Sequence, residues 1–443
     1  MEAVLIALAA FIPMLTLLVV VHELGHFFTG KYFKIKVLEF GIGYPPRAFG
    51  IYTGRTLVRL DQATQFVNLS GAQDLKPGML VKVGSAEFGD GTLVARVIEL
   101  PQRGRAKAPK EEKGKDAKVK DEFLRHEGKI RSVDGSSIIL GDMVYSVNWT
   151  PLGGFVKLAG ENDPAVPRSL AGKSVLARAI VLAAGSAMNA VLPIFIFSLM
   201  FLIPHDVAVG DVTIAEIQPA SPAAAAGLRS GDVIVRAGGR DIEVQQDLTR
   251  AITLSQGSSM EWEVLREGQP RIVQITPRTN PPEGQGPTGV RIVTENIHME
   301  TRADPPWGAV PKAFTSTWEI LVLLRHEVSG WFGGGASPEF SGPIGIAQVT
   351  GEVTREGGFN GWLNLAVLFS INLAILNILP IPMLDGGRLL FVLVEWVRRG
   401  KRIPPEREGL VHLVGFVLLI VFVLLISAKD IQRLLEGRSF LGG

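Results

Sequence analysis

Four long apolar stretches dominate the pattern of hydrophobic and polar positions along the chain. They lie within residues 1–33, 177–204, 362–387 and 409–428, and each approaches the roughly 20 apolar residues that a helix needs to cross a bilayer. Buried helices of soluble domains rarely require so long an apolar run. The pattern therefore predicts a polytopic α-helical membrane protein with about four transmembrane helices.

The first apolar stretch fits either a retained membrane helix or a signal peptide that is removed. Only Glu2 provides a charge before it, whereas a cleavable signal peptide begins with basic residues. The stretch also continues without a break into His22. We interpret residues 1–33 as a retained helix, with a signal peptide as the alternative.

Polar and helix-breaking residues interrupt the third stretch. Asn372, Asn377, Pro380 and Pro382 all lie within it. Broken helices occur at membrane depth only where the backbone lines a protein interior or a water-filled cavity. We therefore expect residues 362–387 to line a polar site.

Basic residues near the ends of the stretches predict how the chain is oriented. Lys31, Lys34 and Lys173 flank the first two stretches on one side, and that side should be cytoplasmic because basic residues accumulate there. The region from about 204 to 361 and both termini should then face outward. The connection between the third and fourth stretches is basic on the same cytoplasmic side, with Arg388, Arg398, Arg399, Lys401, Arg402 and Arg407.

Shorter segments between the stretches predict a β-rich insert at residues 52–148. We expect strands near 79–84, 92–100, 129–133 and 136–140, the last two joined by an Asp-Gly turn. A highly charged stretch at 103–121, without aromatic residues, interrupts these strands. We interpret it as a solvated, disordered linker, with contact to anionic lipid as the alternative.

The outward region contains a second β-rich segment, at residues 206–280. Gly227, Gly231 and Gly239 mark turns between β-branched runs. The segment resembles a PDZ domain of the kind associated with bacterial proteases, which implies that it binds a peptide, such as a C-terminal peptide, by strand addition at a sheet edge. After it, residues 307–332 alternate apolar and charged positions, which indicates an amphipathic helix at the membrane interface.

Composition narrows the possible chemistry. The chain has 443 residues, a formal net charge of +2, seven His and no Cys. The small net charge gives no reason to expect a nucleic-acid partner. Without Cys, disulfides, thiolate metal sites and cysteine nucleophiles are excluded, so a metal would have to bind to His, Asp or Glu.

The motif His22-Glu23-Leu24-Gly25-His26 is the most specific chemical signal in the chain. On a helix, His22 and His26 share one face and can hold one Zn²⁺, while Glu23 lies beside the activated water as a general base. The alternative is a pair of interfacial histidines at the end of a membrane helix. We favour the metal because three ionisable groups at the end of an apolar run are costly.

A third ligand is expected, because catalytic zinc normally takes three protein ligands and leaves one position open. Asp385 is the best candidate, since it ends the broken third stretch and a carboxylate there needs a partner. Its alternative is an aspartate that reaches the membrane edge. The other histidines are less well placed: His126, His205, His298, His326 and His412.

These motifs resemble the site-2 protease family of intramembrane zinc metalloproteases. The resemblance rests on H-E-L-G-H at 22–26, N-x-x-P-x-P-x-L-D-G-G at 377–387 and S-G-P-I-G-I at 341–346. A-G-S-A-M-N at 184–189 is similar to a further family motif, except that Ser186 replaces a proline. The single PDZ-like segment points to the bacterial branch, the regulator-of-sigma-E proteases.

The resemblance implies roles for further residues. Residues 149–160 would form a membrane-re-entrant β-hairpin beside the active site, where Gly153 and Gly154 offer a strand edge to an extended substrate. Asn372 and Asn377 would donate hydrogen bonds to the substrate or the oxyanion, and hydrogen bonding between helices is the alternative for both. His22, His26 and Asp385 would hold zinc, as the spacing already suggests.

The expected function is regulated intramembrane proteolysis in the bacterial inner membrane. Substrates would be single-span membrane proteins or peptides, such as anti-sigma factors and signal-peptide remnants, cut after an earlier trimming step. An inactive membrane-anchored PDZ scaffold is the first alternative, but it should have lost Glu23 or Asp385. A zinc transporter is the second, but it would need His/Asp pairs on several helices.

Overall fold

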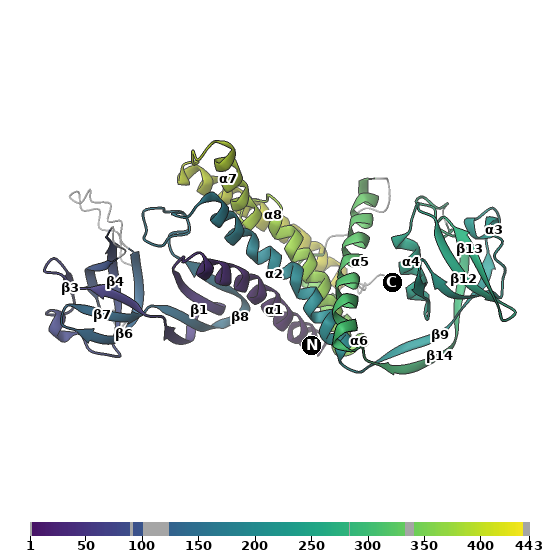
Figure 1. Cartoon of the computed structure of the whole chain (residues 1–443), viewed down its shortest axis with the longest axis horizontal. Helices are drawn as coiled ribbons and strands as arrows, with labels where there is room; N and C mark the ends of the chain where they lie inside the picture. Colours follow the sequence, from purple (N-terminus) through teal and green to yellow (C-terminus); the bar gives the residue numbers. More distant parts are fainter. Residues whose placement is uncertain (1, 89–91, 101–123, 283, 333–340, 437–443) are drawn as a thin grey trace. The chain divides into compact units, whose positions relative to one another are not determined.

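The computed structural model describes residues 2–88, 92–100, 124–282, 284–332 and 341–436 (Figure 1). The chain divides into two compact units, one made of Met1–Leu192 with Phe340–Gly443 and the other of Pro193–Glu339. The two units are described separately below. The whole of the predicted linker at 103–121 lies outside the described residues.

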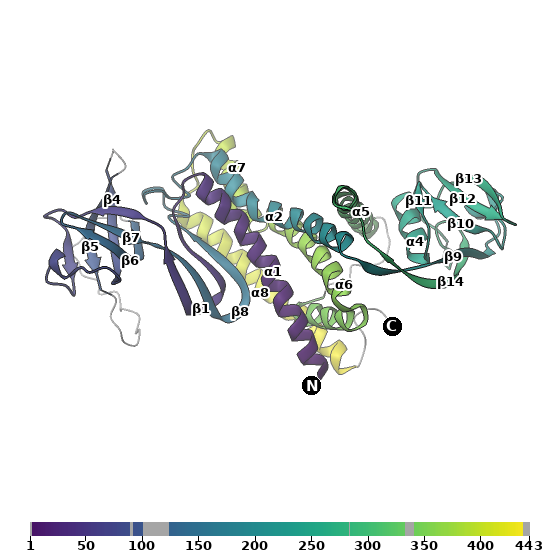
Figure 2. The ribbon, with the colours of Figure 1, turned by 60° about the horizontal axis from the view of Figure 1, so that its bottom comes forward.

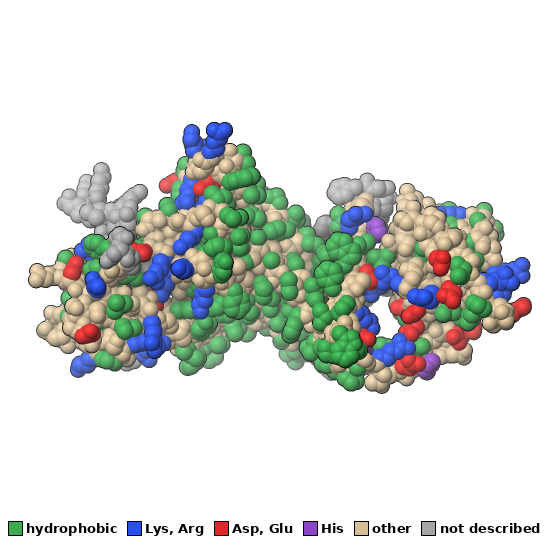
Figure 3. Space-filling view, in the orientation of Figure 1, with side chains coloured by type: hydrophobic (Ala, Val, Ile, Leu, Met, Phe, Trp, Pro, Cys, Tyr) green, Lys and Arg blue, Asp and Glu red, His purple; other side chains and the backbone are tan. Residues whose placement is uncertain are grey.

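Four helices among the described residues are long and apolar enough to cross a membrane, which confirms the prediction of four membrane helices. Figure 3 shows hydrophobic side chains covering the surface over this helical part. On the last of the four, most large apolar side chains are exposed to the surroundings, as expected for a helix that faces lipid. The four are α1 (Glu2–Tyr32), α2 (Val175–Leu202), α6 (Pro343–Ile378) and α8 (Pro405–Leu435).

The third predicted membrane segment, 362–387, contains the break that its prolines predict, and it spans parts of two helices. Helix α6 ends at Ile378, residues 379–384 are not helical, and Asp385 begins a separate helix, α7 (Asp385–Val397). Pro380 and Pro382 account for the break, because proline lacks the N–H that continues a helix. Asp385 therefore lies in the first turn of a new helix and not at the end of an apolar one.

Close packing brings α1 and α6 together. A side chain at Gly351 of α6 would collide with the backbone of Ala7, and the indole N–H of Trp362 donates to the carbonyl of Ala10 at 2.8 Å. Gly358 has φ of +58° and bends α6 sharply between these two contacts. Both arms of α6 can therefore lie against the same helix.

A β-sheet made of two long strands lies along α1 (Figure 2). Strand β1 (Val37–Thr53) and strand β8 (Met143–Leu158) pair with each other, and both bend on themselves. Phe40 is consequently paired on both sides, with Tyr145 and with Val156. The predicted hairpin at 149–160 is corrected: residues 154–158 pair with residues 37–42, more than 100 positions away, and not with a neighbouring strand of a local hairpin.

The insert is a small closed sheet between β1 and β8. Strand β2 pairs with both β7 and β5, so the order β2-β7-β6-β4-β5-β3 closes on itself. Its core consists of fully buried Val58, Ile98, Ile138 and Leu140. The predicted limits of 52–148 extend into β1 and β8. The elements are β2 (Thr56–Arg59), β3 (Gln65–Val67), η1 (Ala72–Asp74), β4 (Leu80–Glu87), β5 (Leu93–Glu99), β6 (Leu124–Asp134) and β7 (Ser137–Gly141).

The second unit contains a separate sheet in the order β13-β12-β10-β9-β14, with fully buried Trp262 in its core. Strand β14 pairs with β9 over its length, so the predicted end at residue 280 is too early and the sheet continues to Arg302. The elements are β9 (His205–Ile217), α3 (Pro222–Ala225), β10 (Val233–Ala237), β11 (Arg240–Asp241), α4 (Gln245–Leu254), β12 (Met260–Arg266), β13 (Gln269–Ile275) and β14 (Val290–Arg302).

Helix α5 (Pro306–Phe332) completes the second unit at the position predicted for an amphipathic helix. The buried carboxylate of Glu319 on α5 forms ion pairs with Arg240 and Arg250 of the sheet domain. Two cations compensate this buried charge, which ties α5 to its own unit. Its location at a membrane interface stays a prediction.

Candidate metal centre

Two histidines and one aspartate bring their ligand atoms to one point in the first unit. His22 Nε2 lies 2.8 Å from Asp385 Oδ2, and His26 Nε2 lies 3.1 Å from the same oxygen. The two Nε2 atoms are 3.2 Å apart. Both histidines are buried on one face of α1, and Asp385 is contributed by the first turn of α7. The fold thus joins residues that are at least 359 positions apart in sequence.

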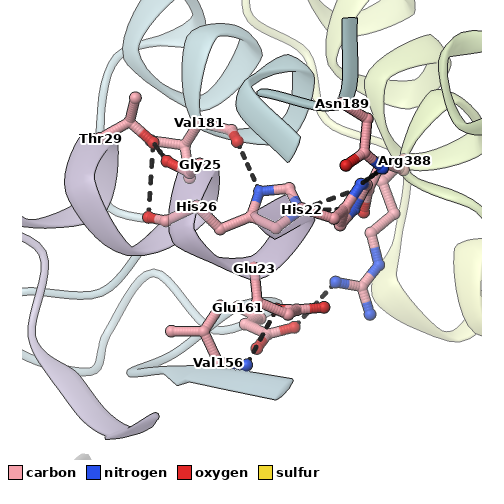
Figure 4. A network of polar contacts seen from close by, with 11 residues as sticks. His22, Glu23, Gly25, His26, Thr29, Val156, Glu161, Val181, Asn189 and Arg388 are labelled. Carbon is pink, nitrogen blue, oxygen red and sulfur yellow. Dashed lines mark hydrogen bonds and ion pairs between the residues drawn. The ribbon is translucent and has the colours of Figure 1, made fainter. Parts of the chain in front are cut away.

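A hydrogen bond fixes which nitrogen of His26 is free. Its Nδ1 donates to the carbonyl oxygen of Val181 on α2 at 2.7 Å (Figure 4). A carbonyl oxygen can only accept, so Nδ1 holds the proton and the lone pair of the neutral ring is on Nε2. Nε2 is the atom that faces His22 and Asp385, as metal binding requires.

His22 has a corresponding contact with Asn189 on α2. The buried amide nitrogen of Asn189 lies 3.4 Å from His22 Nδ1, and the amide oxygen has no hydrogen-bond partner among the described residues. With Nε2 turned to a metal, Nδ1 carries the proton, and the Asn189 amide turned over by 180° would accept it through its free oxygen. Ser370 on α6 donates to the backbone carbonyl of Asn189 at 2.7 Å and so fixes its position.

Glycine at position 185 leaves room beside both imidazoles. A Cβ there would lie 2.5 Å from His22 Nε2 and 2.6 Å from His26 Nε2, which is too close for any side chain. A Cβ at Gly25 of α1 would likewise collide with the backbone of Ala184, so α1 and α2 approach closely at this point. Because Gly25 and Gly185 have no side chains, α1 and α2 can touch and the two Nε2 atoms keep free space beside them.

Glu23 is held by the strand that lies beside α1. The backbone N–H of Val156 in β8 donates to Glu23 Oε2 at 2.9 Å, and Figure 4 shows this contact on the side of α1 that faces the strand. The strand comes close because Gly154 has no side chain: a Cβ would lie 3.0 Å from Val20 Cγ2 and 2.9 Å from the carbonyl oxygen of Gly41. The strand therefore fixes the carboxylate that follows His22.

An ion pair connects α7 to the loop after β8. Arg388, three residues after Asp385, lies 2.8 Å from Glu161 (Figure 4). Both side chains are partly exposed, so the pair contributes little to stability by itself. It adds a link between the strand that holds Glu23 and the helix that begins with Asp385.

The ligand set fits zinc. Bonds of 2.0–2.1 Å in tetrahedral geometry place ligand atoms about 3.3 Å apart, and the three separations of 2.8–3.2 Å are only a few tenths of an ångström shorter. Two imidazole nitrogens and one carboxylate oxygen form a catalytic type of set, which leaves a fourth position for water or substrate. The orientation of both rings for metal binding supports the same conclusion.

The other predicted site residues have different positions. Asn372 and Asn377 are half-buried in α6, and among the described residues neither forms a hydrogen bond with the three ligands. Gly153, with φ of +66°, lies against Val19 of α1. Gly153 and Gly154 are thus next to the helix that holds the histidines, while their role toward a substrate stays a prediction.

Sequence reasoning gave no role to Gly185, Asn189, Val181 or the N–H of Val156. The first two belong to the segment 184–189 that resembles a family motif, so a signal existed. The backbone groups of Val181 and Val156 have no sequence signature, because any residue type offers them. Only the three-dimensional contacts identify these two.

A family model matches most of the chain. Residues 10–74 and 131–422 match Peptidase family M50, and residues 51–99 match a domain of unknown function, DUF5666. The second match covers strands β2 to β5 of the insert. The first match contains all three candidate ligands and Glu23.

Related proteins match over nearly their full length. A zinc metalloprotease RasP from Oceanobacillus iheyensis is 32% identical over 433 residues, which covers 96% of this chain and 98% of the relative. The regulator of sigma-W protease RasP from Bacillus subtilis is 31% identical, with the same shares covered. The PDZ domain of an SdrC-like protein from Listeria monocytogenes is 19% identical and covers 20% of this chain and 92% of that chain, with a TM-score of 0.18.

The family match extends over both halves of the site, since it includes α1 and the segment around Asp385. The relatives share the length of the chain as well as its family. The four helices that can cross a membrane agree with the family match and with these relatives. The chain belongs to Peptidase family M50, as the sequence resemblance predicted, and is a zinc metalloprotease that is integral to the membrane.

Proposed function

We propose that the chain is an intramembrane endopeptidase in which His22, His26 and Asp385 bind the zinc and Glu23 is the general base. The convergence of the two Nε2 atoms and Asp385 Oδ2 within 3.2 Å is the observation that supports this most strongly. It occurs between helices that can cross a membrane. Glu23 is adjacent to the first ligand, and its position is fixed by a backbone hydrogen bond.

Peptide hydrolysis needs a nucleophilic water, a polarised carbonyl and a proton shuttle. The zinc, when bound, supplies Lewis acidity, which lowers the pKa of water and polarises the scissile carbonyl. Glu23 takes a proton from the attacking water while the water oxygen bonds to the carbonyl carbon. Glu23 then gives that proton to the amide nitrogen as the C–N bond breaks. Val156 holds the Glu23 carboxylate in reach throughout.

The substrate is held extended along residues 154–158 of β8. The N–H of Val156 is directed to Glu23, so this edge of the strand faces the candidate catalytic group. Backbone groups alternate between the two edges of a strand, so Gly154 presents its groups on the same edge as Val156. Pairing there would replace hydrogen bonds that a helical substrate loses when it unwinds. Asn372 and Asn377 remain candidates for contacts to the substrate.

The substrates are single-span membrane proteins or peptides, cut in a bacterial inner membrane after prior trimming. One relative bears the name regulator of sigma-W protease, which favours a role in the release of anti-sigma factors. Residues 205–302 act as an extracytoplasmic PDZ domain that selects trimmed substrates. The position of its sheet between two membrane-capable segments, α2 and α6, is compatible with this role.

The variant Glu23→Gln tests the role of the base. We expect it to retain zinc but to cleave a single-span model substrate in detergent at least about 100-fold more slowly, because general acid–base catalysis typically contributes that factor. Glu39→Gln, which changes a carboxylate that pairs with Arg47 and not with the site, is the matched control and should cleave normally. Normal turnover by Glu23→Gln would exclude Glu23 as the base.

A further inference from the structure

The short segment between α6 and α7 determines where Asp385 points. It covers residues 379–384, contains Pro380 and Pro382, and leads directly into the first turn of α7. Met383, two residues before Asp385, has φ of +78°. This left-handed conformation is unfavourable for a residue with a side chain, so surrounding contacts have to maintain it.

Helix α8 supplies a contact at this residue. The backbone N–H of Met383 donates to His412 Nδ1 at 2.9 Å. One turn further along α8, Gly415 touches Pro382 so closely that a Cβ there would collide with the proline ring. The ring of Phe391 on α7 lies 5.5 Å from the ring of His412. His412, on α8, therefore contacts both the segment and α7.

The hydrogen bond defines the state of the His412 ring. Nδ1 accepts a proton from Met383, so it must hold its lone pair, and the ring proton is on Nε2. Nε2 is buried without a hydrogen-bond partner among the described residues, and the nearest acidic oxygen, Glu408 Oε1, is 3.9 Å away. A half-buried histidine in a membrane helix that uses one nitrogen for a distant backbone N–H is more than an apolar packing residue.

We propose that His412 is a positioning residue for the metal centre. By holding Met383 in its left-handed conformation, it directs the Asp385 carboxylate toward His22 and His26 without contacting the metal. The inference rests on the proposed zinc site. It assigns α8 a task in metal binding, although this helix contributes none of the proposed ligands.

Two amide substitutions separate this role from packing. In His412→Asn the amide oxygen can take the position of Nδ1 and accept the N–H of Met383, whereas in His412→Gln the longer side chain places its oxygen nearer to Nε2. Zinc affinity of the purified full chain is measured by competition with a chelator. We expect about a tenfold loss or more for His412→Gln and less than about a threefold loss for His412→Asn, because partners of ligand groups typically contribute 10–100-fold. Equal affinities for both variants and the wild type would overturn the proposal, as would an equal loss in both.

A second substitution tests the link to Met383. Glycine adopts positive φ without strain, so Met383→Gly should make the chain less dependent on His412. The loss of zinc affinity caused by His412→Gln should therefore be smaller in the Met383→Gly background than in the wild type. A loss of the same size in both backgrounds would contradict the proposed connection.

The same preparations distinguish failure of this inference from failure of the metal site. If the wild type binds zinc and Asp385→Ala does not, the proposed zinc site is supported. An unchanged zinc affinity in His412→Gln would then overturn only the proposed role of His412. If the wild type binds no zinc, the proposed site itself is wrong. The absorption spectrum of the Co²⁺-substituted protein provides a second readout: His412→Gln should change it and His412→Asn should not.

Discussion

At the residue scale, each histidine of the H-E-L-G-H motif uses its two ring nitrogens differently. Nε2 faces the metal position, and Nδ1 is bound by a group of α2, the carbonyl of Val181 for His26 and the amide of Asn189 for His22. Metal affinity should therefore depend on α2 as well as on the motif. Two substitutions in α2 test this.

Gly185→Ala should abolish zinc binding. Its Cβ would lie 2.5 Å from His22 Nε2 and 2.6 Å from His26 Nε2, so at least one ring has to move away from the metal position. Gly409→Ala adds the same methyl group to α8, where no atom is within 4 Å, and serves as the control. Zinc per chain after gel filtration is the measurement. A normal zinc content in Gly185→Ala would contradict the arrangement of the two rings.

Asn189→Leu should weaken zinc binding by about 10–100-fold, because it replaces the amide beside His22 Nδ1 by an apolar side chain with the same branching. Ser186→Ala is the matched control on the same helix, since the buried Ser186 hydroxyl has no hydrogen-bond partner among the described residues. Competition with a chelator compares the two variants. Equal affinities would show that Asn189 has no part in orienting His22.

The sequence predicted the three candidate ligands but not the groups that hold them in position. The spacing of His22 and His26 and the isolated carboxylate of Asp385 predict a metal site directly. The partners of Nδ1 come from a helix more than 150 residues away, and one of them is a backbone carbonyl. Periodicity and motif spacing report on neighbours along the chain, so such contacts are not visible in them.

At the element scale, strands β1 and β8 connect distant segments beside α1. The resemblance to the site-2 protease family implied a local hairpin at 149–160. The structure pairs residues 154–158 with residues 37–42 instead. A single sequence shows which segments favour strands but not which distant strand they pair with. The break between α6 and α7 was recognisable from Pro380 and Pro382, although its position relative to Asp385 was misjudged.

Gly154→Val should reduce cleavage more than tenfold while zinc binding stays close to normal. The new side chain would meet Val20 and the carbonyl of Gly41, and so would move the strand that holds Glu23 without contacting the ligands. Gly71→Ala adds a methyl group where the nearest atoms are 3.8 Å away and is the control. Cleavage of a single-span substrate and zinc content are measured together. Full activity of Gly154→Val would mean that the strand does not have to lie against α1.

At the scale of the whole molecule, the metal site belongs to the first unit alone. All three ligands, Glu23 and Asn189 lie within it, and the second unit has its own core around Trp262. Replacing residues 205–302 by a short linker should therefore leave zinc binding unchanged and broaden the range of substrates cut. Loss of zinc in this variant would show that the second unit supports the site.

The second unit should lose stability in acid through Asp232. Burial raises the pKa of this carboxyl, but hydrogen bonds from the Arg266 guanidinium and the Arg229 N–H outweigh burial and hold the pKa below its usual value. The folded state thus binds the proton less tightly than the unfolded chain. The stabilisation is complete above the unfolded pKa of about 4 and is lost as the pH falls through the folded pKa.

Hydrogen exchange of β10 and β12 in the full chain, corrected for the intrinsic rate at each pH, measures this loss. Asp232→Asn should exchange faster than the wild type at neutral pH and change less between about pH 4 and pH 2. Asp241→Asn, at an exposed carboxylate paired with Arg236, is the control and should behave as the wild type. An acid response of Asp232→Asn as steep as that of the wild type would assign the effect to another group.

Zinc-edge X-ray absorption of the purified full chain tests the central claim most directly. The account predicts one zinc per chain, with two imidazole nitrogens at about 2.0–2.1 Å and a carboxylate oxygen at about 2.0–2.2 Å. In Asp385→Ala, this coordination shell should be lost. A wild-type spectrum with fewer than two imidazoles, or an Asp385→Ala spectrum identical to that of the wild type, would contradict it.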